Sequence, residues 1–339
     1  MTKEQLITED YAIYNSDCME VLPTIPDDSI DLVVYSPPFA GLYNYSSSER
    51  DFSNCESKEQ FMQQYEFLVA EMARVTKPGR INVVHCQDIL IQTTKHNLWD
   101  FPHEIIKLHA KYGFTYNNRI TIWKEPLEVR MRTMVQSLMH KNIVEDSTKC
   151  FTAIPDYLLV FRKAGENKVP VVHPFGLTHY AGDTPILKNI VQAHNNANDT
   201  RYTPEEFWEF ICAKYKDHKE HFSNKMSHYI WQRYASSVWD DIRGRNVLDF
   251  RDGKEEDDEK HVHPLQLDVI DRCVDLWSNL GEVVLTPFMG VGSEVYSPVS
   301  MGRKAIGIEL KDSYYKQAIA NLKTVKSRFI SEQTQQSLF

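Results

Sequence analysis

An apolar run that is cut short by two consecutive prolines is the feature that most constrains this chain. Residues Ile30–Tyr35 (IDLVVY) have the length and the β-branched content of a buried strand. Pro37 and Pro38 follow almost at once, and proline can neither donate a hydrogen bond to a sheet nor continue into the interior of a helix. The strand therefore ends at Ser36, which the following proline biases toward an extended conformation.

The corner after this strand is suited to a planar amino group. The Ser36 hydroxyl and the carbonyl oxygens of Ser36 and Pro37 would be fixed acceptors, and Phe39 beside them offers a ring face. An exocyclic NH₂ can give one proton to each of two such oxygens while its ring stacks on the aromatic side chain. A simple strand-ending turn would explain the same four residues, so this motif alone leaves the function open.

A second motif lies far downstream. Leu285 to Ser293 read LTPFMGVGS, and Gly302 to Leu310 read GRKAIGIEL. A glycine loop between a strand and a helix lets backbone N–H groups approach a ligand, and a helix N-terminus favours a carboxylate. Glu309 lies 17 residues beyond Gly292, where dinucleotide-type folds place an acid that accepts ribose hydroxyls. The spacing alone would also allow a nicotinamide dinucleotide.

Taken together, the two motifs resemble those of the DNA amino-methyltransferases, which modify N6 of adenine or N4 of cytosine. The first matches their catalytic (D/N/S)-P-P-(Y/F) tetrapeptide, and the resemblance implies catalytic roles for Ser36, Pro37, Pro38 and Phe39. The second matches their S-adenosylmethionine loop, usually D-P-F-x-G-x-G, with Thr286 in place of the Asp. The implied cofactor is S-adenosylmethionine, without a metal. The residues implied to bind it are Asp17, Pro287, Phe288, Gly290, Gly292, Ser293 and Glu309.

Asp17 has two interpretations. It lies where a short strand, residues 11–14, gives way to a helix, so its side chain could simply cap that helix. The resemblance gives it a second role, because the segment matches the family's G-D-x-x-x-x-L stretch, whose Asp approaches the adenine of the methyl donor. Ser16 replaces the usual glycine of that stretch.

The order of the motifs implies the architecture. The tetrapeptide precedes the cofactor loop by 250 residues, as in the β arrangement of the family. This implies an α/β fold with one Rossmann-like sheet, a circularly permuted motif order and an inserted target-recognition region. The expected division is a catalytic half at 1–163, a target-recognition region at 164–240 and a cofactor-binding half at 241–339. Ser36 and Gly290 should then meet at neighbouring strand ends, where ligands bind in open α/β sheets.

Hydrophobic periodicity predicts the elements that carry these motifs. Further strands are expected at 81–85, 114–123, 155–163 and 282–285, and helices at 58–76, 101–112, 204–214, 225–234 and from 263 to about 279. Loops are expected at 195–199, which is rich in Asn, and at 128–147, where the family has a disordered or DNA-facing segment.

Composition limits the remaining classes. With 339 residues and 42% hydrophobic content, the chain can bury a large core. Its six cysteines are scattered without a C-x-x-C pair, which predicts reduced thiols rather than a zinc site or disulfides, and none lies in a Pro-Cys motif like that of the cytosine C5 methyltransferases. No apolar stretch approaches the roughly 20 residues of a membrane span, and the polar start is no signal peptide. We expect a soluble protein in the cytoplasm of a prokaryotic or phage-infected cell.

The net charge of -9 is unusual for a DNA-binding protein. Residues 101–170, however, hold 11 Lys and Arg against 7 Asp and Glu, a local charge of +4. This favours a cationic face for phosphates, with Arg130, Arg132 and Lys141 as the candidates, although an ordinary mixed surface explains the count as well. The expected partner is double-stranded DNA, with a cognate restriction endonuclease or none, and the chain is expected to be a monomer or a homodimer without a membrane.

The first residue of the tetrapeptide bears on the base. Family members with Ser at this position mostly act on cytosine N4, whereas Asp and Asn mostly mark adenine N6, so Ser36 favours N4-methylcytosine, with N6-adenine as the alternative. Hydrogen bonds to Ser36 and the Pro37 carbonyl would localise the lone pair of a flipped base, and Phe39 would stack on it. An RNA or protein-glutamine methyltransferase and a non-catalytic DNA-binding relative are the other classes that remain open.

Overall fold

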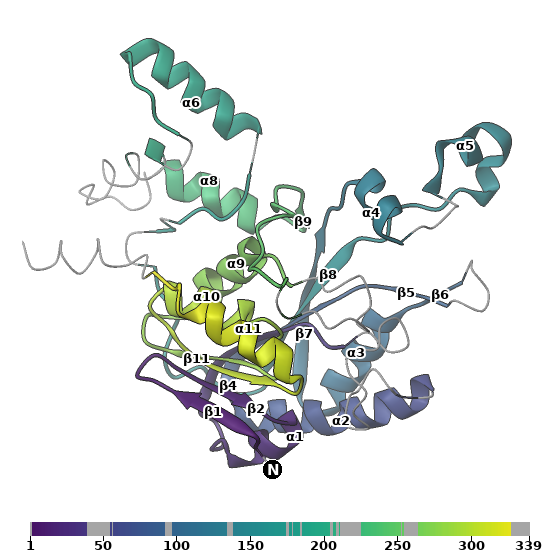
Figure 1. Ribbon diagram of the computed structural model, residues 1–339, viewed down its shortest axis with the longest axis vertical. Coiled ribbons are helices and arrows are strands. Elements are labelled where there is room, and N and C mark those ends of the chain that lie inside the picture. Colours follow the sequence, from purple (N-terminus) through teal and green to yellow (C-terminus); the bar gives the residue numbers. More distant parts are fainter. Residues whose placement is uncertain are drawn as a thin grey trace, which may run out of the picture.

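One twisted sheet organises the part of the chain that the computed structural model describes. The described residues are 2–38, 55, 57–91, 97–133, 138–173, 176–177, 179–183, 185–203, 206–207, 210, 225–251, 253 and 264–326. Within them, nine strands form the sheet in the order β1-β2-β11-β10-β3-β4-β8-β7-β9 (Figure 1). Their bounds in chain order are β1 Glu4–Ile7, β2 Tyr11–Asn15, β3 Ile30–Tyr35, β4 Thr76–Cys86, β7 Phe114–Ile122, β8 Asp156–Lys163, β9 Val238–Trp239, β10 Val283–Thr286 and β11 Lys304–Glu309.

The two ends of the chain build the centre of this sheet together. Strands β2, β11, β10, β3 and β4 run parallel, and β10 pairs with β3 through Val284 opposite Leu32 and Leu285 opposite Val33. Beyond β4, the hairpin of β7 and β8 continues the sheet antiparallel. The predicted α/β fold with a permuted motif order is confirmed. The predicted division into 1–163, 164–240 and 241–339 stays a prediction.

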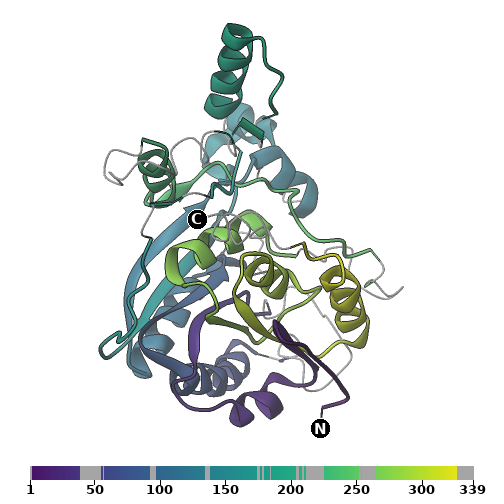
Figure 2. The same ribbon diagram turned by 90° about the vertical axis from the view of Figure 1, so that its left-hand side faces the viewer.

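Helices cover both faces of the sheet, because the central strands carry apolar side chains on both faces. In β3, Val33 and Tyr35 pack in the cluster that includes α2, whereas Leu32 and Val34 pack with α9. The first layer holds α1 (Cys18–Val21), α2 (Lys58–Val75) and α3 (Phe101–Lys111), and the second holds α9 (Leu267–Trp277), α10 (Ser293–Ser300) and α11 (Asp312–Leu322). In Figure 2 the purple and blue helices of the first layer lie on a different side of the strands from the green and yellow helices of the second.

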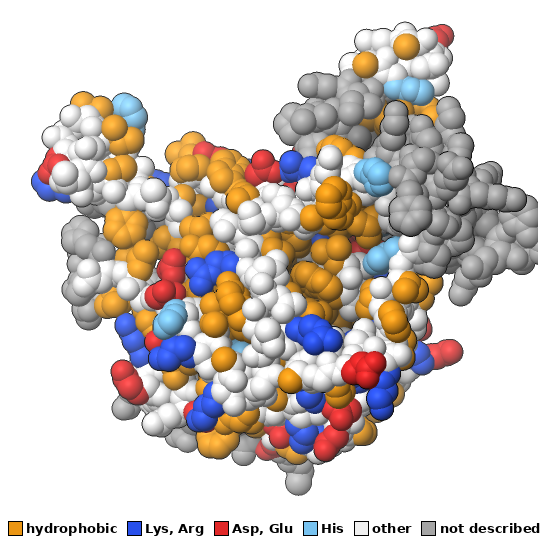
Figure 3. Space-filling view, turned by 180° about the vertical axis from the view of Figure 1, so that it is seen from behind, with side chains coloured by type: hydrophobic (Ala, Val, Ile, Leu, Met, Phe, Trp, Pro, Cys, Tyr) orange, Lys and Arg blue, Asp and Glu red, His pale blue; other side chains and the backbone are white. Residues whose placement is uncertain are grey.

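Two pairs of helices project from the body (Figure 1). One lobe carries α4 (Pro126–Thr133) and α5 (His140–Asp146), and the other carries α6 (Pro185–Asn198) and α8 (Lys225–Tyr234). The space-filling view shows the surface falling away between these lobes (Figure 3). In the described ranges, no helix combines the length and the apolar character that crossing a membrane requires.

Two predicted loops are helical instead. The segment 128–147 contains most of α4 and all of α5, and α6 runs through the Asn-rich residues Asn195 and Asn198. The asparagines act at the end of that helix: Asn195 Oδ1 accepts hydrogen bonds from Thr200 Oγ1 at 2.9 Å and from the Tyr202 N–H at 3.0 Å. A residue type that favours turns thus holds the chain that leaves the helix. Four short strands were also missed by sequence analysis. These are β5 (Ile89–Leu90) and β6 (Leu98–Trp99), which form a small sheet of their own, and the edge strands β1 and β9 of the main sheet.

Candidate active site

The polar side chains at the end of β3 meet those of the next strand. Because β3 and β4 are parallel and Tyr35 lies opposite Val84, Ser36 comes to lie beside His85. The Ser36 Oγ lies 2.7 Å from His85 Nδ1, a strong hydrogen bond between a hydroxyl and an imidazole. Pro37 is buried, and Phe39 lies outside the described residues.

The His85 ring continues into a charged pair. Its Nε2 lies 3.2 Å from Asp156 Oδ2, at an ion-pair distance but without the straight geometry of a hydrogen bond. The other carboxylate oxygen of Asp156 accepts a hydrogen bond from Lys124. Burial raises the pKa of Asp156, but Lys124 and His85 together outweigh it and hold this pKa below the usual range of an aspartate. Ser36, His85, Asp156 and Lys124 thus form one chain of contacts, which we call the corner chain.

The predicted cofactor residues lie along the same edge of the sheet. Strands β2 and β11 place Asn15 opposite Glu309, so the Asp17 turn and the Glu309 carboxylate lie at neighbouring strand ends. Glu309 Oε2 accepts the Gly290 N–H at 2.9 Å, and its Oε1 accepts the Lys311 N–H at 2.8 Å. Asp17 caps α1, because its Oδ1 accepts the Met19 N–H at 2.9 Å. The capping interpretation is confirmed, and the second role of Asp17 stays a prediction.

The two loop glycines face different surroundings. Gly290 has a φ of 51°, and a Cβ added to it would have no neighbour within 4 Å. Gly292 has a φ of 95°, and its added Cβ would lie 3.1 Å from the Cβ of Ala318 on α11. Gly290 therefore borders open space at the strand ends, whereas Gly292 lets the loop pack against a helix.

The loop also holds polar atoms that suit a small polar ligand. Among the described residues, the buried Ser293 Oγ makes no hydrogen bond, and it belongs to the first turn of α10, where backbone N–H groups favour an anion. The Phe288 ring lies 6.1 Å from the ring of Tyr35, the residue before Ser36, so the loop adjoins the corner. An amino-acid carboxylate at α10 and a ribose near Glu309 fit these groups, as S-adenosylmethionine would require.

Comparison with known proteins agrees with this geometry. Residues 30–320 match the family model of the N6 and N4 methyltransferases, whose description is DNA methylase. The chain belongs to this DNA methylase family. The predictions of the family, of a DNA amino-methyltransferase and of S-adenosylmethionine as its cofactor are confirmed.

The known relatives have low sequence identity to the methylase, but their alignments extend over most of its length. The Type II methyltransferase M.BglII of Bacillus subtilis is 24% identical over 89% of this chain and 66% of its own length, so the chain spans just under two thirds of that relative. The DNA adenine methyltransferase YhdJ of Escherichia coli is 23% identical over 95% of this chain and 85% of its own. A DNA modification methylase of Thermus thermophilus, solved in complex with S-adenosyl-L-methionine, shares the fold with a TM-score of 0.55 and 22% identity, covering 92% of this chain and 94% of that one.

The predicted phosphate contacts belong to the α4 and α5 lobe rather than to the corner. Lys141 is exposed on α5, whereas Arg130 on α4 is half-buried, and the side chain of Arg132 lies outside the described residues. On the face that Figure 3 shows, Lys and Arg side chains are interspersed with Asp and Glu. A role for these three residues in DNA binding stays a prediction.

Sequence reasoning missed three members of the corner chain. His85 ends a strand that was predicted, so the pairing of neighbouring parallel strands could have placed it beside Ser36. Placing Asp156 beside His85 requires knowledge of the register between the antiparallel strands β4 and β8, in which Leu158 rather than Asp156 lies opposite His85. Lys124 follows β7 and reaches Asp156 only because Ile122 pairs with that residue.

Proposed function

We propose that the methylase transfers the methyl group of S-adenosylmethionine to the N4 amino group of a cytosine that is flipped out of double-stranded DNA. The choice of base rests on one observation, the serine at the first position of the tetrapeptide. Its hydroxyl lies at the carboxyl end of β3 and is held by His85 at 2.7 Å, as a group that must receive an amine requires.

The corner residues would act by position. The conjugated amine of cytosine is a poor nucleophile because its lone pair is delocalised into the ring. Hydrogen bonds from its two N–H protons to Ser36 Oγ and to the Pro37 carbonyl would turn that lone pair toward the methyl donor near Gly290. The donor supplies an activated methyl group, and the residues of the chain supply orientation and exclude water.

N6-adenine is the second candidate. It is favoured by the similarity to YhdJ, a DNA adenine methyltransferase that the chain matches over 85% of its length. Both amines adjoin an unprotonated ring nitrogen and can donate two hydrogen bonds, so the corner distinguishes them weakly and the size of the base pocket must do the rest.

Nucleoside analysis decides between these candidates. Unmodified duplex DNA, RNA and a protein mixture are incubated in parallel with the methylase and a donor that carries a labelled methyl group, and the DNA is digested for mass spectrometry. We expect N4-methylcytosine. N6-methyladenine without N4-methylcytosine would overturn the choice of base, 5-methylcytosine would overturn transfer to an amine, and label confined to RNA or protein would overturn the substrate class.

A matched pair of serine variants ties the activity to the corner. Ser36→Ala should lower the rate about 100-fold, the order of magnitude lost with one preorganised hydrogen-bond partner. Ser29→Ala is the control, because Ser29 precedes the opposite end of β3 and its hydroxyl only donates to the Pro26 carbonyl at 2.6 Å. An equal loss in both variants would mean that strand stability, not the Ser36 hydroxyl, sets the rate.

A further inference from the structure

We propose that His85, held by Asp156, takes up through Ser36 the proton that the target amine releases when it is methylated. This inference rests on the proposed function, because it concerns the same corner, but it adds a proton acceptor to that site. It is carried by the geometry of the corner chain, in which a hydroxyl, an imidazole and a carboxylate follow one another.

The contacts fix which nitrogen of His85 carries the proton. A bare Nε2 would set its lone pair 3.2 Å from the Asp156 carboxylate, whereas a protonated Nε2 places a positive N–H beside that carboxylate, even though the two groups are not aligned as a hydrogen bond. Nδ1 is then an acceptor without a proton, and at 2.7 Å it must receive the proton of Ser36. Both lone pairs of the serine oxygen therefore remain available to the amine.

The proton balance of the transfer needs an acceptor at this place. The amine nitrogen forms a bond to the methyl carbon with its lone pair, and the electron pair of the broken carbon–sulfur bond goes to sulfur. The nitrogen then carries a positive charge until it loses one N–H proton. Ser36 Oγ accepts that proton and passes its own to His85 Nδ1, and the imidazolium later returns it to water. One methyl cation is transferred and one proton is released.

The surroundings of His85 suit this step. His85 is only 8% exposed and Asp156 only 5%, so bulk water has poor access to the imidazole and the carboxylate. The imidazolium would lie beside the Asp156 carboxylate from β8. Among the described residues, the charged groups in contact on this side are this carboxylate and, on the far side of the carboxylate, Lys124, which follows β7. Lys124 keeps Asp156 ionised and therefore ready to stabilise the imidazolium.

A double-mutant cycle separates this role from a structural one. Single-turnover rates on unmodified duplex DNA are measured for the wild type, His85→Ala, Ser36→Ala and the double variant. If His85 acts through the serine hydroxyl, His85→Ala lowers the wild-type rate by a factor on the order of 10 to 100 but has little further effect on Ser36→Ala. Equal losses in both backgrounds would overturn the proposal. His103→Ala, at an exposed histidine of α3, is the control and should not change the rate.

The pH profile separates proton uptake from orientation. His85→Asn keeps an oxygen that can accept the Ser36 hydrogen bond but cannot take up its proton. The wild-type rate should fall on the acid side, where a protonated imidazole can no longer accept, and His85→Asn should be slow with no such acid limb. An unchanged acid limb in His85→Asn would assign it to another group and overturn the proposal.

A measurement without substrate keeps the two proposals apart. ¹⁵N spectra of histidine-labelled methylase, with the His85 signal assigned from His85→Asn, should show the neutral ring protonated on Nε2, and Asp156→Asn should weaken this preference. A ring protonated on Nδ1 would overturn the proton relay even if the methylase acts on DNA. A wild type that methylates no DNA would instead overturn the proposed function.

Discussion

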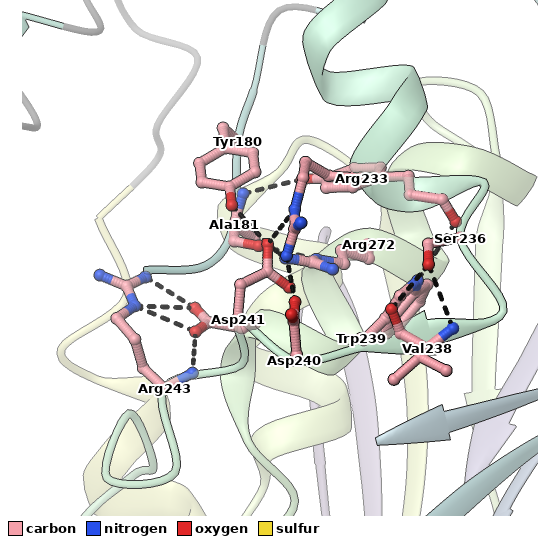
Figure 4. A network of polar contacts seen from close by, with 12 residues as sticks. Tyr180, Ala181, Arg233, Ser236, Val238, Trp239, Asp240, Asp241, Arg243 and Arg272 are labelled. Atoms are coloured by element: carbon pink, nitrogen blue, oxygen red, sulfur yellow. Dashed lines mark hydrogen bonds and ion pairs between the residues drawn. The ribbon is translucent and has the colours of Figure 1, made fainter. Parts of the chain in front are cut away.

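Two of the buried polar clusters in the described part of this methylase are built in opposite ways. The corner chain is linear, and Ser36 at one end of it is half-exposed. The second, which we call the Arg272 cluster, is closed around a guanidinium that is 0% exposed (Figure 4). Arg272 Nε donates to the Ala181 carbonyl at 2.7 Å, and its Nη2 lies 2.8 Å from Asp241 Oδ2.

The Arg272 cluster surrounds its charge from several directions. The guanidinium lies 4.7 Å from the ring centroid of Tyr234 and 4.8 Å from that of Trp239. Asp241 also accepts hydrogen bonds from Tyr180 and Arg233. Arg272 belongs to α9, whereas its partners belong to residues 180–241, so the cluster fastens this part of the chain to the helix that covers the sheet.

The difference shows what each arrangement is for. In the corner chain, every member passes a hydrogen bond or a charge to the next, and a proton can travel along it. In the Arg272 cluster, the charge of Arg272 is fixed between a carboxylate, a carbonyl and aromatic rings, and the link through Asp241 and Arg233 ends in an ion pair with the exposed Asp240. We expect changes in the corner chain to affect rate more than stability, and changes in the Arg272 cluster to do the reverse.

The largest effect should come from opening the closed cluster. Arg272→Ala removes a buried cation from a buried carboxylate and should lower the free energy of unfolding by about 3 to 5 kcal/mol. Urea unfolding monitored by circular dichroism measures this loss, and Arg245→Ala is the control because the Arg245 side chain is 92% exposed. His85→Ala should change the unfolding midpoint far less. If His85→Ala destabilised as much as Arg272→Ala, the two clusters would not differ in kind.

The same contrast explains what the sequence could predict. The corner and the cofactor loop are short motifs in which proline and glycine fix the local backbone, so the residue pattern alone is enough to assign Ser36 and Gly290 to strand ends. The Arg272 cluster has no such signal, because Arg272 and Asp241 lie 31 residues apart in ordinary surroundings. Their meeting depends on how the chain returns to α9, which is a matter of packing and not of local pattern.

Asn195 and His85 show on a smaller scale how far local sequence patterns can predict the structure. Asparagine is typical of loops, but here Asn195 lies in the last turn of α6, and its side chain binds Thr200 and Tyr202 just beyond the helix, so it marks the end of a helix rather than a loop. The strands that carry His85 and Asp156 were both predicted, but the contact between the two residues was not, because pairing between residues 71 positions apart leaves no trace in periodicity.

The glycines of the loop allow the cofactor side of the open site to be tested separately from its packing. Gly290→Val places a side chain in the open space and should weaken S-adenosylmethionine binding at least about 100-fold, with a modest loss of stability from its positive φ. Gly292→Val should act mainly on stability, because its side chain meets Ala318. Calorimetric titration and thermal melting of both variants measure the two effects.

A second substitution makes this distinction sharper. Ala318→Gly removes the atom that a side chain at position 292 would meet, so it should restore part of the stability of Gly292→Val and leave Gly290→Val unchanged. Near-normal donor affinity in Gly290→Val would remove that residue from the cofactor site. The family resemblance implies that both glycines bind the donor, and this pair of variants tests each of them.

The last effect concerns Glu294, a buried carboxylate that belongs to neither cluster. It lies in the first turn of α10, is 5% exposed, and forms no ion pair within the described part of the chain. Burial raises its pKa to about 8, and the nearby Glu309 adds to this against a backbone hydrogen bond. The folded protein therefore holds this proton more tightly than the unfolded chain does, so the free energy of unfolding should fall as pH rises from about 4.5 to about 8.

Glu294→Gln tests whether the ionised form of a buried acid without a cationic partner destabilises the protein, in contrast to Asp156, which has Lys124 as its partner. The amide keeps the shape and removes the charge, so variant and wild type should be similarly stable near pH 5. The variant should become more stable than the wild type by about 3 to 4 kcal/mol by pH 8, because only the wild type then has to bury a charge. Thermal melts across this range measure the difference, with Glu59→Gln in the exposed first turn of α2 as the control. A difference that stays constant with pH would show that Glu294 gains a counter-charge in solution and resembles the paired acids after all.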